Sequence, residues 1–195
     1  MNLPNLLTLL RVFLTFFFIF FLYQDGLAFK IMALGVFILA SLTDFLDGYY
    51  ARKYNIITQF GKIMDPIADK FLMLSAFFIF STMRIIAGWM FIIIFAREMI
   101  VTGLRLLAIR GKATLAAEKA GKVKTVLQII AVYLIIIFII AAQFNINTQW
   151  YANFMSIAIS GITVFMVGVV LITLSSGLSF IWNNRKEIFN STGKH

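Results

Sequence analysis

The sequence predicts an all-α integral membrane protein, with six transmembrane helices around a polar cavity that opens to the cytoplasmic side. Of its 195 residues, 62% are hydrophobic. Six apolar stretches each approach or exceed the roughly 20 residues that cross a hydrocarbon core. Charged residues interrupt several stretches, where they are costly unless they face a polar interior. We expect a single domain over residues 1–195.

The first three helices are separated by short polar or basic breaks. The first, Leu3–Leu22, starts without the small-residue cleavage site of a signal peptide and ends at the polar segment Tyr23–Gly26. The second, Leu27–Ala51, ends at the basic segment Arg52–Gly61, and the third covers Lys62–Met83. We therefore expect three apolar helices in the N-terminal half.

The last three helices follow the same rule. Ile85–Ile109 is followed by the basic segment Arg110–Lys122, and Val123–Gln143 by a short polar break. The final run, Trp150–Trp182, is longer than an untilted span needs. We expect it to project beyond the bilayer at one end.

Lysine and arginine set the expected orientation. If both termini are cytoplasmic, the outer side keeps only Lys30 and Arg84, as the positive-inside rule requires. The net charge of +9 then indicates topology and anionic headgroups, with no nucleic-acid partner. We expect a multi-pass protein of the cell (inner or plasma) membrane. The inner loops and tail would hold Arg52, Lys53, Lys62, Arg110, Lys112, Lys119, Lys122, Lys124, Arg185, Lys186 and Lys194.

Half of the eight acidic residues lie in one short stretch among these apolar runs. Asp44 and Asp47 are three residues apart and Asp65 and Asp69 four apart, so each pair shares a helical face. The chain has no cysteine and one histidine, His195, which excludes thiolate ligands and histidine-based chemistry. Four carboxylates favour two hard divalent cations, Mg²⁺ or Mn²⁺. A divalent-cation transporter could use intramembrane aspartates too, but these lie near one face and the chain lacks paired broken helices.

The carboxylates belong to the frame D-x-x-D-G-x-x-A-R-x8-G-x-x-x-D-x-x-x-D, which resembles the signature of the CDP-alcohol phosphotransferases at every position. The resemblance implies that a hydroxyl attacks the phosphate of a CDP-activated lipid such as CDP-diacylglycerol and releases CMP. It also implies a homodimer. By the same resemblance, the metal ligands are Asp44, Asp47, Asp65 and Asp69, the general base is Asp69, and the CDP site is lined by Gly48, Ala51, Arg52 and Gly61.

A second set of motifs is similar to the phosphatidylglycerophosphate synthase branch of that family. They read R-E-x-x-x-T-G-x-R from Arg97 and G-K-x-K-T from Gly121. This similarity implies glycerol 3-phosphate as the acceptor, a dianion that needs cationic partners. We expect Arg97, Arg105, Lys122 and Lys124 to bind it.

The first helix adds two further candidates. Arg11 lies too deep for its side chain to reach the interface freely, so we expect it to serve the diphosphate or the fold of the site. Thr8 is a weaker candidate, because it could simply serve the start of that helix. The alternative acceptors are inositol phosphate, serine and phosphatidylglycerol, of which only inositol phosphate would need as many cations.

Overall fold

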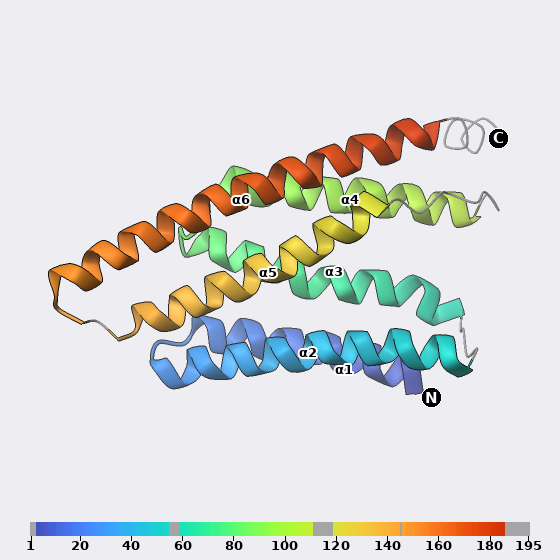
Figure 1. Ribbon diagram of the computed structural model, residues 1–195. Helices are drawn as coiled ribbons and strands as arrows, with labels where there is room; N and C mark the ends of the chain where they lie inside the picture. The colour runs from blue at the N-terminus through green and yellow to red at the C-terminus, as the bar shows by residue number, and fades with distance from the viewer. Residues whose placement is uncertain (1–2, 55–58, 111–118, 145, 186–195) are drawn as a thin grey trace.

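A computed structural model shows six α-helices and, over the residues that it describes, no strand (Figure 1). It describes residues 3–54, 59–110, 119–144 and 146–185, and the side chains of residues 9–43, 70–105, 121, 123–144 and 146–185. The helices are α1 (Leu3–Tyr23), α2 (Leu27–Tyr54), α3 (Gln59–Thr82), α4 (Gly88–Arg110), α5 (Lys119–Ala142) and α6 (Gln149–Asn183). The all-α prediction and the order of the six helices are confirmed.

The helices at the predicted cytoplasmic end are longer than their apolar runs. Arg52 and Lys53 fall inside α2, Lys62 inside α3, and Lys119 in the first turn of α5. Arginine and lysine are good helix formers, and a helix can continue past the last apolar residue where its backbone is paired internally. The basic residues therefore extend the helices here, and the connections are shorter than predicted.

The start of α4 also differs from the prediction, because Ile85 lies in the turn that closes α3. Arg84 adopts a left-handed backbone with φ of 58°. Its N–H donates to the carbonyl of Ser81 at 3.0 Å, and that of Ile85 donates to the carbonyl of Phe80 at 2.9 Å. This pattern is a Schellman motif, which reverses the chain and delays the next helix to Gly88.

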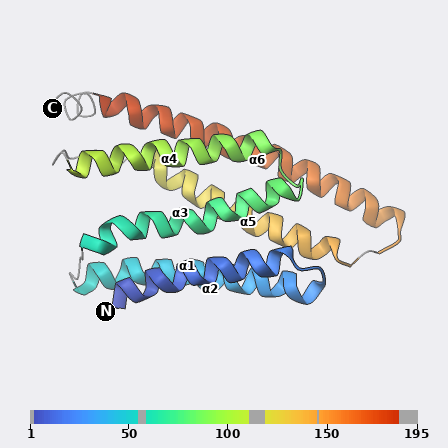
Figure 2. The same cartoon turned by 180° about the vertical axis from the view of Figure 1, so that it is seen from behind.

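The bundle has three levels (Figures 1 and 2). α1 packs against α2 and α3 on one side, and α6 packs against α4 and α5 on the other. α3 and α5 contact each other in the middle of the bundle. They join its two sides, because α3 also contacts α4 and α5 also contacts α2. Successive helices run in opposite directions, so α1 begins and α6 ends at the same end of the bundle.

An aromatic and aliphatic core holds these levels together. The ring of Phe37 in α2 lies 5.5 Å from that of Phe18 in α1 and 5.1 Å from that of Tyr133 in α5. Lys30 of α2 is also buried. Its Nζ has a partner there, because it donates to the carbonyl of Leu22 near the end of α1 at 2.6 Å. Ile135 of α5 is fully buried in the same core.

The outer surface carries many large apolar side chains, such as Phe13 in α1 and Val164 in α6. Within the described residues, two stretches are long and apolar enough to cross a membrane, Val123–Ala142 and Gln149–Asn183. An apolar exterior around a bundle with polar groups inside is the arrangement expected in lipid.

Candidate functional site

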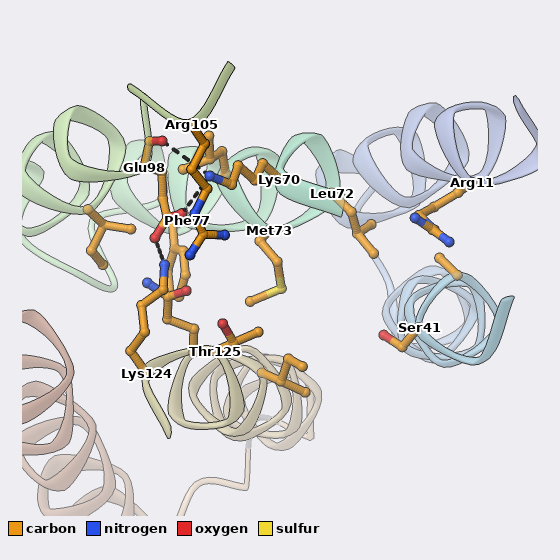
Figure 3. A pocket seen from close by; sticks show the side chains of 15 residues that line it. Arg11, Ser41, Lys70, Leu72, Met73, Phe77, Glu98, Arg105, Lys124 and Thr125 are labelled. Carbon is orange, nitrogen blue, oxygen red and sulfur yellow. Dashed lines mark hydrogen bonds and ion pairs between the residues drawn. The ribbon is translucent and has the colours of Figure 1, made fainter. Parts of the chain in front are cut away.

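A cavity of about 390 Å³ lies between five helices, α1 to α5 (Figure 3). Its apolar wall includes Phe77 and Ile94. Its polar wall gathers residues that are far apart in the chain, and its four cations lie on four different helices. The polar lining residues are Arg11, Ser41, Lys70, Glu98, Arg105, Lys124, Thr125 and Gln128.

Glu98 is the centre of the charged wall. Its Oε2 pairs with the amine of Lys70 at 3.1 Å, and its Oε1 pairs with Nη1 of Arg97 at 3.2 Å and with the amine of Lys124. The residue is 5% exposed. The carboxylate therefore joins α3, α4 and α5 through buried ion pairs, which need such partners because desolvated charges are costly alone.

Thr102 completes this arrangement one turn further along α4. Its hydroxyl donates to the carbonyl of Glu98 at 2.6 Å and accepts from the amine of Lys70. The same amine donates to the Glu98 carbonyl at 3.2 Å. The amine of Lys70 is thus held in place by Glu98 and Thr102, although 24% of the lysine side chain stays exposed.

The cavity wall carries more positive than negative charge. Arg105 lies with Lys70 and Lys124 around Glu98 (Figure 3), and its guanidinium is 5.3 Å from the ring centre of Phe180 in α6. Three lining cations face one described lining carboxylate on this side. Such a surplus attracts a small anion with several negative oxygens, such as a phosphate.

Arg97 occupies a different place from Arg105. It pairs with Glu98, and its Nη2 donates to the hydroxyl of Ser176 in α6 at 2.9 Å. It is not among the residues that line the cavity. The structure thus brings Arg105 and Lys124 to the cavity, whereas Arg97 lies outside the cavity lining, between Glu98 and α6.

Arg11 lies on the opposite side of the cavity, near Ser41 of α2 (Figure 3). It is 1% exposed, so this arginine of α1 belongs to the interior, as expected from its depth. Sequence reasoning gave no site role to four polar lining residues, Ser41, Lys70, Thr125 and Gln128. Lys70 directly follows Asp69 in the frame, and a lysine next to an apolar run was the signal that could have identified it.

The aspartate frame lies on helices whose backbone is described. Two aspartates are in α2 and two in α3, with spacings of three and four residues, so the helical premise of the predicted pairs is met. Among the side chains that the structure describes, no three acidic, histidine or cysteine side chains gather. The side chains of these predicted residues lie outside that part: Thr8, Asp44, Asp47, Gly48, Ala51, Arg52, Gly61, Asp65, Asp69 and Lys122.

An apolar groove of about 680 Å³ lies between α3 and α4 and shares Lys70 with the cavity. Its walls are mainly apolar and include four aromatic side chains, Phe71, Phe78, Phe91 and Phe95. A cationic group at one end of an apolar groove suits an amphipathic molecule with an anionic head.

Comparison with known proteins gives a consistent result. The family model described as CDP-alcohol phosphatidyltransferase matches residues 1–183. A protein of Escherichia coli named CDP-diacylglycerol–glycerol-3-phosphate 3-phosphatidyltransferase is 31% identical over 194 residues, which cover 97% of this chain and 98% of that one. A Rickettsia felis protein of the same name is 42% identical over 70% of this chain and 75% of its own. The match to a Bacillus subtilis protein of that name, 50% identical, spans half of each chain.

Proposed function

Because the chain belongs to the CDP-alcohol phosphatidyltransferase family, we propose that it transfers the phosphatidyl group of CDP-diacylglycerol to sn-glycerol 3-phosphate, with release of CMP. The observation that carries the acceptor is the surplus of positive charge in the cavity, where Lys70, Arg105 and Lys124 surround Glu98. A neutral acceptor such as serine would not need three cations. The names of the relatives support the same acceptor.

The chemistry assigns distinct tasks to the residues. The acceptor hydroxyl oxygen forms a bond to the phosphorus of the phosphatidyl group, and the bond from that phosphorus to the CMP oxygen breaks, with the electron pair leaving on CMP. Asp69 accepts the hydroxyl proton. Lys70, Arg105 and Lys124 hold the acceptor phosphate by charge-assisted hydrogen bonds. On the nucleotide side, Gly48, Ala51, Arg52 and Gly61 line the CDP site.

The carboxylate frame fits two hard divalent cations, Mg²⁺ or Mn²⁺, by its all-oxygen donors. Asp44 follows the cavity-lining residue Ser41 by three residues, and Asp69 precedes the lining residue Met73 by four. Positions at these spacings share a side of a helix, so in this proposal the frame would continue the cavity wall. The ligands would be Asp44, Asp47, Asp65 and Asp69. Bound there, the cations would neutralise the diphosphate and stabilise the leaving oxygen.

The setting of the reaction is a membrane. All six helices span it in this proposal, and the cavity opens to the cytoplasm. The chain is a single domain that forms a homodimer in the cell (inner or plasma) membrane. The apolar groove beside Lys70 fits the acyl part of a lipid donor. The exposed apolar side chains of α1 and α6 support this setting.

The acceptor is tested with purified protein in detergent, CDP-diacylglycerol and Mg²⁺, scored by CMP release. Glycerol 3-phosphate, serine, inositol phosphate and phosphatidylglycerol are supplied separately. We expect turnover with glycerol 3-phosphate, and an increase in its KM in Arg105→Ala, with the KM for CDP-diacylglycerol little changed. Faster turnover with one of the other three alcohols would mean that this alcohol is the acceptor, with the same reaction and the same family.

The metal requirement is a separate test. Asp44→Ala, Asp47→Ala, Asp65→Ala and Asp69→Ala should each abolish turnover, because each removes a ligand. Chelation of the wild-type protein should do the same, and Mg²⁺ or Mn²⁺ should restore activity. Full activity in chelator would overturn the two-metal proposal. Asp25→Asn, at an exposed acidic residue between α1 and α2, serves as the control.

A further inference from the structure

We infer that one side of α6 positions the cationic groups of the anion site and so sets its affinity for the acceptor phosphate. This side consists of Thr173, Ser176, Gly177 and Phe180, which we call the α6 seat. The inference rests on the proposed function and extends it to a helix without a single charged residue inside its bounds. None of the motifs in the sequence pointed to α6.

The α6 seat differs from the rest of the buried side of α6. From Ile162 to Val170 this side is apolar, and from Thr173 onward it becomes polar or small before Phe180. The four positions are spaced by three, one and three residues, so they form one stripe along the helix. Buried hydroxyl groups inside a membrane bundle are costly unless they have partners, so their partners indicate their role.

Each member of the seat faces a group from α4 or α5. The hydroxyl of Ser176 accepts from Nη2 of Arg97 at 2.9 Å, and the ring of Phe180 lies under the guanidinium of Arg105. Nε2 of Gln128, a cavity-lining residue, donates to the hydroxyl of Thr173 at 3.4 Å. The seat therefore contacts three side chains of the site without lining the cavity itself.

Gly177 provides the space that Arg97 occupies. A Cβ added at Gly177 would lie 2.9 Å from Cγ and 3.3 Å from Nε of Arg97. Cγ is near the base of the side chain and cannot move aside alone, because the guanidinium is held by Glu98 and Ser176 at the other end. Any side chain at position 177 must therefore displace Arg97.

A displaced Arg97 would disturb the amines at the cavity. Arg97 shares Oε1 of Glu98 with Lys124, while Oε2 pairs with Lys70. If Arg97 moves, the carboxylate of Glu98 loses one of its three partners and is held less firmly. The amines of Lys70 and Lys124, which pair with that carboxylate, are then held less firmly as well. Arg97, Ser176 and Gly177 are thus positioning residues, and Lys70 and Lys124 are the groups through which they act.

The test measures KM and kcat for glycerol 3-phosphate and for CDP-diacylglycerol in four variants. Gly177→Ala should raise the KM for glycerol 3-phosphate roughly ten-fold, the scale of one lost hydrogen bond to a charged group, and Ser176→Ala somewhat less. The KM for CDP-diacylglycerol should stay within about two-fold of the wild-type value, the scale of effect expected of a substitution away from the groups that bind that substrate. The matched controls are Gly168→Ala, whose added Cβ meets no atom within 4 Å, and the exposed Ser175→Ala, both expected to behave as wild type.

A double-mutant cycle shows whether Gly177 acts through Arg97. In an Arg97→Ala background the clash is gone, so adding Gly177→Ala should cause no further change in KM. An equal increase in both backgrounds would mean a general packing effect of α6 and would overturn the inference. So would a wild-type KM for Gly177→Ala.

The inference can fail separately from the proposed function. Equilibrium binding of inorganic phosphate to the same variants needs no turnover, so it applies even if glycerol 3-phosphate proves not to be the acceptor. Weaker phosphate binding in Gly177→Ala, but not in Gly168→Ala, supports the α6 seat. Equal binding in the two variants removes it, whatever the enzyme assay gives.

Discussion

At the scale of single residues, the site depends on one carboxylate. Glu98 is buried and binds three cations from three helices, so its charge is offset several times over. Breaking a buried ion pair by removing one partner is far more costly than losing a surface pair, because the remaining charges stay desolvated. Glu98 therefore holds the fold of the site together and also leaves net positive charge for a ligand.

Glu98→Gln tests both roles. The amide keeps the shape but leaves three cations without their common counter-charge, which should cost on the order of 3 kcal/mol of folding free energy. We expect a lower thermal unfolding midpoint in detergent. Millimolar phosphate should raise that midpoint less than it does in the wild type, because Lys70 and Lys124 lose the carboxylate that positions them and the folded state binds the anion more weakly. Asp25→Asn changes the net charge equally at an exposed position and should lower the midpoint much less, because Lys30, the cation that Asp25 favours, keeps its hydrogen bond to the carbonyl of Leu22. Phosphate shifts of the same size in Glu98→Gln and wild type would contradict this account.

At the scale of elements, the end of α3 shows how a helix terminates without glycine. Arg84 takes the left-handed conformation that glycine usually supplies at this position of a Schellman motif. The motif is completed by its two backbone hydrogen bonds to Ser81 and Phe80. The conformation costs an ordinary residue about 1–2 kcal/mol, so the α3–α4 connection is held against local strain.

Arg84→Gly should stabilise the protein by about 1 kcal/mol, because glycine adopts this backbone without the steric cost, offset in part by its greater freedom when unfolded. The measurement is the thermal unfolding midpoint in detergent. Arg84→Ala is the matched control, because it removes the same charge and keeps the unfavourable backbone. If the glycine and alanine variants had the same midpoint, the left-handed turn would not be the source of strain.

At the scale of the whole molecule, alternating helix directions bring distant charges to one depth. Arg11, Lys70, Arg105 and Lys124 come from four helices and line one cavity. Two of these residues lie toward the bundle end at which α1 begins and α6 ends (Figure 1), because Arg105 is near the end of α4 and Lys124 near the start of α5. The orientation of the bundle in the membrane then decides from which side a soluble acceptor can enter.

The orientation can be tested directly, since the chain has no cysteine of its own. Asn147→Cys lies between α5 and α6 at the predicted outer end, and Ser191→Cys lies in the C-terminal tail. A membrane-impermeant maleimide applied to intact cells should label only the first, and should label both after the cells are opened. Labelling of Ser191→Cys in intact cells would reverse the topology and the side of substrate entry.

The sequence by itself determined the six helices and their order, because long apolar runs with basic or polar breaks leave few alternatives in lipid. It also identified Arg11 and Arg105 as interior cations, since a charge deep in an apolar run must face a polar space. Lys124 was expected in an inner loop, and its binding role came only from the family resemblance. The exact helix ends differed from those predicted, as at the start of α4. The turn at Arg84 depends on backbone conformation, which residue types alone did not reveal there.

Only the tertiary structure decided which charged side chains share a surface. Arg97 and Arg105 are eight residues apart on α4. The first pairs with Glu98 and donates to Ser176 of α6 outside the cavity lining, whereas the second lines the cavity. That difference follows from the rotation of α4 and from the space that Gly177 leaves for Arg97. Rotation is set by packing between helices, and a sequence pattern carries no record of which neighbour each side will meet.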